Sequence, residues 1–152
     1  MKGIRQLQKN EGVPYHLLLL ADETIEAINR YINDSELYIF EQDNRIKAIY
    51  VLQIEDRMNI EIKNIAVEEV SQGQGIGKLL LRDAASRAKA RGFKTITIGT
   101  GDALTMQLEL YQREGFKIFG IRKDFFIDNY SEPIYENGIQ LKHMVMLKKK
   151  LQ

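Results

Sequence analysis

The segment Gln72-Gly-Gln-Gly-Ile-Gly77 stands between a predicted strand and a predicted helix. Residues 61–67 (Glu-Ile-Lys-Asn-Ile-Ala-Val) have the apolar and β-branched pattern of a strand, and the residues from Lys78 onward have the pattern of a helix. A glycine-rich turn that opens a helix directs several backbone N–H groups at one point, and the helix dipole favours an anion there. The segment therefore predicts a site for a phosphate-bearing ligand.

Two common nucleotide-binding patterns do not fit this segment. A P-loop requires Gly-x4-Gly-Lys-Ser/Thr, but Gln72 stands where its first glycine should be, and Leu79 supplies no hydroxyl after Gly77-Lys78. The dinucleotide fingerprint Gly-x-Gly-x-x-Gly requires a third glycine at position 78 or 80. Those positions hold Lys78 and Leu80, so both patterns are excluded.

Length and composition narrow the class of protein. The chain has 152 residues and a net charge of +1, so it fits one domain (1–152) with no bias toward nucleic acid or an anionic membrane. It contains no cysteine and only two histidines, which argues against a thiolate or His-rich metal site. The leucine-rich segment at residues 16–21 is too short to span a bilayer. We expect a cytoplasmic protein without a metal.

The periodicity of apolar residues predicts a mixed sheet with flanking helices. Strands are expected over residues 3–7, 36–40, 46–54, 60–67, 95–98, 117–121 and 140–148, and helices over 14–20, 23–32, 75–91 and 106–114. Residues 124–138 read as a polar and aromatic loop, and His143 shares an apolar face with Leu141 and Val145, which favours a core position. This order is typical of an α/β (α+β) domain with a mixed sheet.

The glycine segment also fits a third pattern, Gln/Arg-x-x-Gly-x-Gly/Ala, through Gln72, Gly75 and Gly77. This resembles the acyl-CoA loop of the GNAT superfamily of N-acetyltransferases. Residues 110–116 (Leu-Tyr-Gln-Arg-Glu-Gly-Phe) are similar to the Leu-Tyr-x3-Gly-Phe segment of that family, and the resemblance covers residues 36–121. It implies a mostly antiparallel, splayed sheet and transfer of an acetyl group from acetyl-CoA to an amine. Residues 129–138 look like the tail of small bacterial members whose acceptors are mostly undefined.

The resemblance also implies where acetyl-CoA binds: its arm lies between strands 60–67 and 95–100, with its pyrophosphate on the glycine loop. The implied contacts are Ile65, Ala66, Val67, Gln72, Gly73, Gln74, Gly75, Ile76, Gly77, Lys78 and Asp102. Many members carry an Asn in the place of Asp102, which lacks the amide donor; Asp102 is alternatively the N-cap of the next helix. Strict alternation along the strand predicts that the side chains of Glu61 and Val67 point to the same face of the sheet. The two residues are then about 20 Å apart, which is similar to the length of an extended pantetheine arm.

Two side chains are expected to carry the chemistry. An acceptor amine must lose a proton before it attacks, and Glu61 matches the general-base position of the histone acetyltransferase branch, with Glu55 as the reserve base. Tyr111 matches the tyrosine that protonates the departing thiolate in the family. With no cysteine in the chain, an acyl-cysteine intermediate is excluded, and we expect direct attack in a ternary complex.

We expect the residues that determine acceptor specificity to lie in two segments, 15–35 and 124–138. The second segment contains four carboxylates, four aromatic residues and no Lys or Arg, which favours a cationic small-molecule or peptide amine. The alternatives are a non-catalytic acyl-CoA sensor or interaction module, which needs neither Glu61 nor Tyr111, and a purely structural domain. A homodimer through exposed strand edges is a further expectation.

Overall fold

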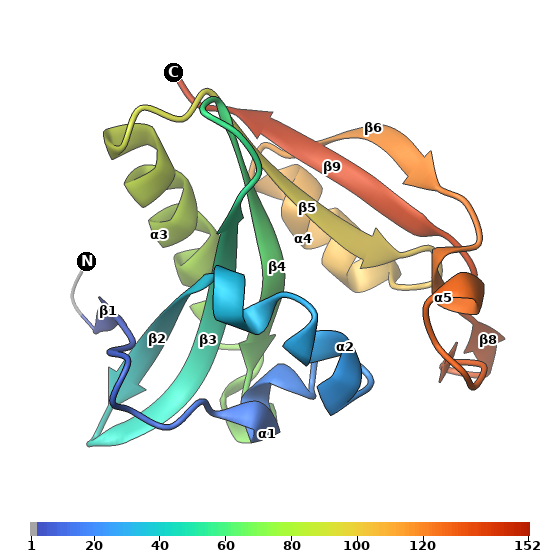
Figure 1. Ribbon diagram of the computed structural model, residues 1–152, viewed down its shortest axis with the longest axis horizontal. Helices are drawn as coiled ribbons and strands as arrows, with labels where there is room; N and C mark the ends of the chain where they lie inside the picture. Colours follow the sequence, from blue (N-terminus) through green and yellow to red (C-terminus); the bar gives the residue numbers. More distant parts are fainter. Residues whose placement is uncertain (1–2) are drawn as a thin grey trace.

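The computed structural model describes residues 3–152, which form a seven-stranded sheet and a separate two-stranded hairpin. The large sheet has the order β1-β2-β3-β4-β5-β9-β6; only β4 and β5 are parallel neighbours (Figure 1). Its strands are β1 (Ile4–Gln6), β2 (Glu36–Gln42), β3 (Arg45–Ile54), β4 (Asn59–Val67), β5 (Thr95–Gly101), β6 (Lys117–Arg122) and β9 (Met144–Lys150), and the hairpin pairs β7 (Tyr135–Glu136) with β8 (Ile139–Gln140). This mostly antiparallel mixed sheet confirms the predicted fold class.

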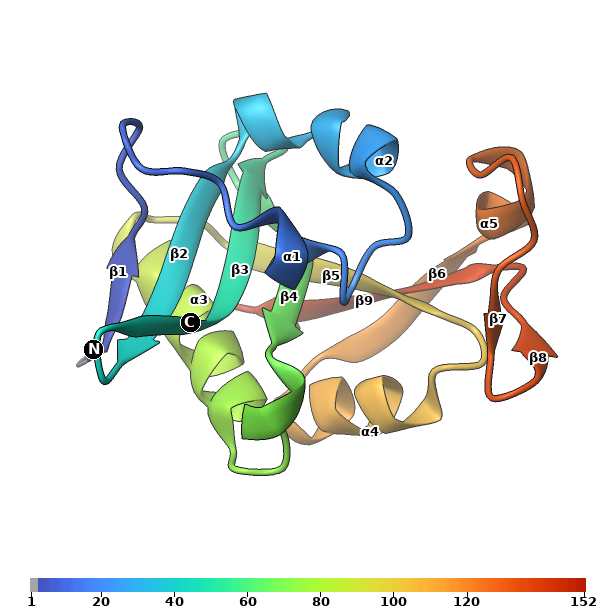
Figure 2. The ribbon, with the colours of Figure 1, turned by 90° about the horizontal axis from the view of Figure 1, so that it is seen from below.

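Helices cover both faces of the sheet. Figure 2 shows α3 (Ile76–Ala90) and α4 (Thr105–Arg113) on one face, and α1 (Tyr15–Leu18) and α2 (Ile25–Asn29) on the other. Burial on both faces explains the unbroken apolar run of β3: Tyr50 and Leu52 pack in the α3 cluster, and Ile49 and Val51 in the cluster of α1 and α2. None of the helices in residues 3–152 is both long enough and apolar enough to cross a membrane.

The apolar positions of α3 follow the predicted four-residue spacing. Ile76, Leu80, Ala84 and Ala88 are all buried on the sheet, as expected for one face of a helix. A polar cluster is buried beside them, because the Asp83 carboxylate accepts hydrogen bonds from Tyr50 Oη at 2.7 Å and Arg87 Nε at 2.8 Å. These partners satisfy a carboxylate that is only 2% exposed.

Strands β4 and β5 pair over only part of their lengths, and this separation positions the site. Asn59–Ile62 pair with Thr95–Ile98, after which the two strands diverge (Figure 1). The edge of β4 that faces β5 therefore has no strand partner beyond Ile62. A β-bulge lies at the same point, because Leu52 pairs with Ile62 and Val51 with Asn64, which leaves Lys63 as the extra residue.

Several predicted boundaries were wrong at the edges of the fold. The N-terminal helices are shorter than 14–20 and 23–32: Thr24 caps α2 by accepting from the Ala27 N–H at 3.0 Å, and the backbone at Tyr31 is non-helical before a 3-10 turn at Ile32–Asp34. The segment 124–138 is not all loop, since it contains α5 (Phe125–Asp128) and β7.

The last strand begins at Met144 and ends at Lys150, in place of the predicted 140–148. Residues 141–143 make contacts with the preceding loop instead of the sheet: the Leu141 N–H donates to the Ile134 carbonyl at 2.8 Å, and His143 Nδ1 accepts from the Asp124 N–H at 2.9 Å. The His143 side chain is 33% exposed, so the predicted core position was wrong.

Candidate active site

A cleft of about 1160 Å3 lies where β4 and β5 separate. Its lining combines five parts of the chain that are distant in sequence: residues 20–31, β4 with the glycine loop, the carboxyl end of β5, α4, and residues 122–144. The cleft therefore joins the loop that predicts a phosphate site to both segments that were expected to recognise an acceptor.

The glycine loop closes one end of the cleft. Gly73 and Gly75 have φ of 80° and 83°, a left-handed conformation that other residues adopt only with strain. Gly75 is the N-cap of α3, so the unpaired N–H groups of the first turn of that helix remain available to an anion. The Gln72 amide donates to the Val67 carbonyl at 2.9 Å and ties the loop to the end of β4.

Nine of the residues expected to contact acetyl-CoA line this cleft, and two do not. Those that line it are Ile65, Ala66, Val67, Gln72, Gly73, Gly75, Ile76, Gly77 and Lys78. Gln74 lies instead beside Phe40 in a smaller depression. Asp102 is outside the cleft lining and accepts a hydrogen bond from the Lys142 N–H at 3.1 Å. Leu104, and not Asp102, precedes α4 as its N-cap, so the capping alternative was wrong.

Glu61 lies where the two strands begin to separate, paired in register with Thr97. It is 6% exposed, and its carboxylate is 3.7 Å from Lys63 Nζ. Burial raises the pKa of Glu61 above its ordinary value; Lys63 and Arg122 oppose this rise and neighbouring Glu55 adds to it. Glu55 itself is exposed, is absent from the cleft lining, and accepts from Thr97 Oγ1 at 3.2 Å.

The β-bulge at Lys63 overturns one predicted relationship. Ile62 and Ile65 are three residues apart, yet both pack with Val67 in the apolar cluster on the α3 face of the sheet. Glu61 lies on the opposite face, beside Thr97. The expectation that Glu61 and Val67 share a side was therefore wrong, because the extra residue shifts the alternation by one. The carboxylate reaches the cleft from the face that carries α1 and α2.

Tyr111 on α4 reaches the cleft from the face of the sheet opposite to the face that carries Glu61. Its side chain is 6% exposed and packs beside Phe116, with ring centroids 6.4 Å apart. Burial alone raises the pKa of the phenol, so the group stays protonated across the neutral range. A buried, protonated phenol at a cleft has the properties of a general acid.

The outer half of the cleft is bounded by the N-terminal helices and the α5 segment. The two are tied together, since the Asp22 carboxylate accepts from Tyr31 Oη at 3.1 Å and also from Tyr130 Oη. Asn64 donates from Nδ2 to Tyr31 Oη at 3.1 Å, and its buried Oδ1 has no partner among the described residues. Of the four carboxylates predicted to face an acceptor from residues 124–138, only Glu136 lines the cleft.

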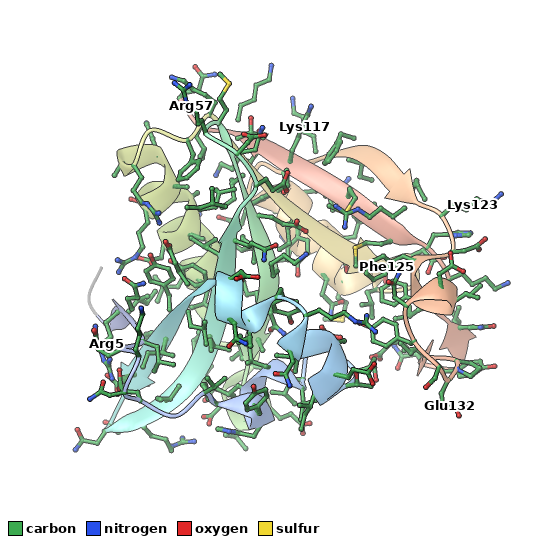
Figure 3. All side chains as sticks on the ribbon, in the orientation of Figure 1. Arg5, Arg57, Lys117, Lys123, Phe125 and Glu132 are labelled. Carbon is green, nitrogen blue, oxygen red and sulfur yellow. The ribbon has the colours of Figure 1, made fainter. Side chains whose placement is uncertain are left out.

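Figure 3 shows that the side chains of residues 124–138, the segment that contains α5, do not all lie near the cleft. Phe125 lies on the side of α5 that is nearer the sheet, whereas Glu132 stands at the outer tip of the loop. Phe125, Phe126 and Tyr130 line the cleft, and the rings of Phe126 and Tyr130 stack with centroids 6.0 Å apart. The aromatic half of the predicted acceptor surface therefore faces the cleft more fully than the acidic half does.

Comparison with known proteins agrees with this geometry. Residues 33–118 match the family model described as the acetyltransferase (GNAT) domain. The chain belongs to the GNAT superfamily. Among curated relatives of this GNAT protein, an uncharacterized N-acetyltransferase of Bacillus subtilis, YvbK, is 44% identical over 133 residues, which are 88% of this chain and 86% of the relative.

Solved structures of other GNAT proteins match nearly the whole chain. An acetyltransferase of Elizabethkingia anophelis with acetyl-CoA bound has a TM-score of 0.95 at 48% identity, covering 97% of each chain. A Bacillus subtilis acetyltransferase in complex with CoA has a TM-score of 0.91 at 41% identity, covering 98% of each chain. This GNAT protein is therefore an acyltransferase of the N-acetyltransferase class, and these likenesses support acetyl-CoA as its co-substrate.

Several residues at the GNAT cleft were not predicted from the sequence. Lys63 and Arg122 both act on the charge of Glu61, and Asp22, Tyr31 and Asn64 form the connected polar group at its outer half. No local pattern marks these residues, because they meet only after β6 and the N-terminal helices pack around β4. The nearest signal is the Lys63-Asn64 pair, which interrupts the alternation of apolar residues along the strand.

Proposed function

We propose that this protein transfers an acetyl group from acetyl-CoA to the primary amine of a small molecule or peptide by direct attack in a ternary complex. The single observation that carries this proposal is the cleft itself. One end is a helix N-terminus with free N–H groups, and its middle presents Glu61 and Tyr111 from opposite faces of the sheet. An acyl-CoA sensor would need the first feature and neither of the others.

In the proposed reaction, Glu61 takes a proton from the acceptor ammonium, directly or through water, and the neutral amine attacks the thioester carbonyl carbon. The new C–N bond forms, the C–S bond breaks, and Tyr111 gives its proton to the departing thiolate. The nitrogen of the new amide then loses its remaining extra proton, which returns to the Tyr111 phenolate through water, and Glu61 releases the proton that it took to solvent. The burial of both side chains supports these roles, because Glu61 has a raised pKa suited to accepting a proton and Tyr111 remains protonated.

The backbone of β4 supplies the other proposed contacts. Beyond Ile62 its edge toward β5 has no strand partner, so the pantetheine arm can hydrogen-bond to Ile65 and Val67 as an added strand would. We assign the Val67 N–H to the thioester carbonyl, where a fixed donor stabilises the developing oxyanion. The pyrophosphate then meets the N–H groups of residues 72–78.

We propose a cationic acceptor whose charge lies toward the outer half of the cleft. Burial raises the pKa of Glu23, and the nearby carboxylates Glu136 and Asp22 add to this rise. A cation bound among these carboxylates relieves their mutual repulsion, and the rings of Tyr31, Phe125 and Phe126 supply cation–π surfaces.

An amine panel tests the proposed function. Acetyl-CoA is incubated with diamines, aminoglycosides, lysine peptides, and neutral or acidic amines, and free thiol is measured. We expect thiol release with at least one cationic amine, together with loss of the rate at neutral pH in Glu61→Gln. Acetyl-CoA binding without thiol release from any amine would favour the sensor, and preference for acidic acceptors would refute the cationic proposal.

A further inference from the structure

The Glu61 carboxylate is the centre of a charged cluster drawn from four strands. Lys63 on β4 has its Nζ 3.7 Å from Glu61 Oε1. Arg122 at the end of β6 lines the same cleft, and its charge opposes the rise in the pKa of Glu61. Glu55, just beyond β3, is the neighbouring carboxylate, and Thr97 on β5 holds it through a 3.2 Å hydrogen bond. Two cations and one anion therefore surround one buried carboxylate.

The β-bulge brings Asn64 to the face of the sheet that carries Glu61 and Lys63. In a regular strand, Glu61 and Lys63 would lie on one face because they are two residues apart, and Asn64 would point to the opposite face. With the extra residue, Glu61, Lys63 and Asn64 all lie on the face of α1 and α2. The Lys63 ammonium also lies 5.6 Å from the centroid of the Tyr31 ring, which limits where it can move.

We propose that Lys63, Arg122 and Glu55 are positioning residues that set the electrostatic potential at the Glu61 carboxylate, the two cations favouring its ionised form and Glu55 opposing them. This proposal rests on the proposed function of Glu61 as the base. None of the three needs to touch the reacting atoms, because each acts through the electrostatic potential at the Glu61 carboxylate.

Because the acceptor nitrogen must come within reach of Glu61 to lose its proton, the same cations would also act on the acceptor. A positive charge close to the reacting nitrogen disfavours its ammonium form and favours the neutral amine that attacks. The cluster therefore promotes loss of the proton from the acceptor while keeping Glu61 ready to receive it. An additional cationic group of the acceptor is better held farther out, at Glu23 and Glu136.

The test measures Glu61 directly in the protein without substrates. Glutamate carboxyl carbons are labelled with 13C, the Glu61 resonance is identified by its loss in Glu61→Gln, and its pH titration is followed by NMR. Removing a cation should raise the pKa of Glu61 and removing the anion should lower it, each by on the order of one pH unit. We expect the rise in Lys63→Met, Lys63→Gln and Arg122→Met, and the fall in Glu55→Gln.

The controls separate an electrostatic role from a general disturbance. Lys63→Arg should titrate close to the wild type, the double variant Lys63→Met with Glu55→Gln should lie between the single variants, and Lys47→Met, a lysine paired elsewhere, should not shift. The low-pH limb of kcat should move in the same directions. Unchanged titration in both Lys63→Met and Glu55→Gln, or shifts of the same sign, would overturn the proposal.

This measurement does not depend on turnover, so it tests the charged cluster around Glu61 separately from the role of Glu61 as the base. Opposite shifts in the NMR titration establish the cluster whether or not an acceptor has been found. If Glu61→Gln retained full activity across pH, the role of Glu61 as base would fail, and the cluster would lose its catalytic purpose although the titration shifts remained.

Discussion

The environment of Tyr111 determines which form of its phenol the protein holds. The side chain comes from α4 into the closed side of the cleft, where burial disfavours the charged phenolate. Glu61 is buried to a similar extent, but two cations offset the cost of its charge. A carboxyl with a raised pKa and a protonated phenol therefore face one cleft, which are the properties of the base and the acid in the proposed transfer.

Replacing Tyr111 with Phe should slow turnover without abolishing it. A thiolate leaves moderately well unaided, so we expect kcat to fall by about ten- to a hundred-fold, toward the lower end of general-acid effects, with the KM for acetyl-CoA nearly unchanged. Steady-state kinetics of Tyr111→Phe beside Tyr135→Phe provides the measurement, since Tyr135 is 61% exposed and outside the cleft lining. A wild-type kcat in Tyr111→Phe would remove the tyrosine from the mechanism.

At the scale of elements, the glycine loop and α3 act as one unit. Left-handed backbone at Gly73 and Gly75 turns the chain sharply after β4, so that α3 starts with its N–H groups at the cleft. The apolar face of α3 then packs against β3 and β4, which holds this start in place. The anion site depends on the packing of the helix as much as on the glycines.

Gly75→Val and Gly92→Val form a matched pair at the two ends of α3. Both glycines have positive φ (83° and 91°) and neither has a neighbour within 4 Å of an added Cβ, so each valine brings backbone strain of about 1–2 kcal/mol or more. Both variants should therefore unfold at a lower temperature. Only Gly75→Val should lose acetyl-CoA affinity by calorimetry; equal affinity in the two would remove the loop from the site.

At the scale of the whole molecule, the cleft exists because β4 and β5 pair at only one end and then separate. Residues 20–31 and 122–144 approach from opposite sides of the separation between β4 and β5, and the hydrogen bond from Tyr130 Oη to the Asp22 carboxylate connects them. The proposed phosphate end and the proposed acceptor end belong to one cleft, so the proposed function has both substrates bound at once.

Initial-rate kinetics should therefore give intersecting lines when acetyl-CoA and the amine are both varied. Direct attack requires both substrates in the cleft before the first product leaves, and the chain has no cysteine to carry an acetyl group between them. Parallel lines, together with an acetylated protein detected by mass spectrometry in the absence of amine, would contradict direct transfer.

The sequence predicted the parts of the site that depend on local patterns. Gly75 and Gly77 could be read as a helix-opening turn, and Tyr111 as part of a segment typical of the family, because spacing along the chain determines both features. The length of α2 was overestimated because apolar residues continue past Arg30, while the cap at Thr24 and the non-helical Tyr31 limit the helix. The core position predicted for His143 was wrong because an alternating pattern does not reveal that the Asp124 N–H donates a hydrogen bond to its imidazole ring.

By itself, the sequence determined the fold class, the position of the glycine loop and the identity of the two candidate catalytic side chains, since each follows from periodicity or from a short motif. Only the tertiary structure decided that Glu61 and Val67 lie on opposite faces, that Asp102 lies outside the cleft lining, and that Lys63, Arg122 and Glu55 surround Glu61. The physical reason is that a bulge, a separated strand pair and an electrostatic cluster arise from contacts between distant segments.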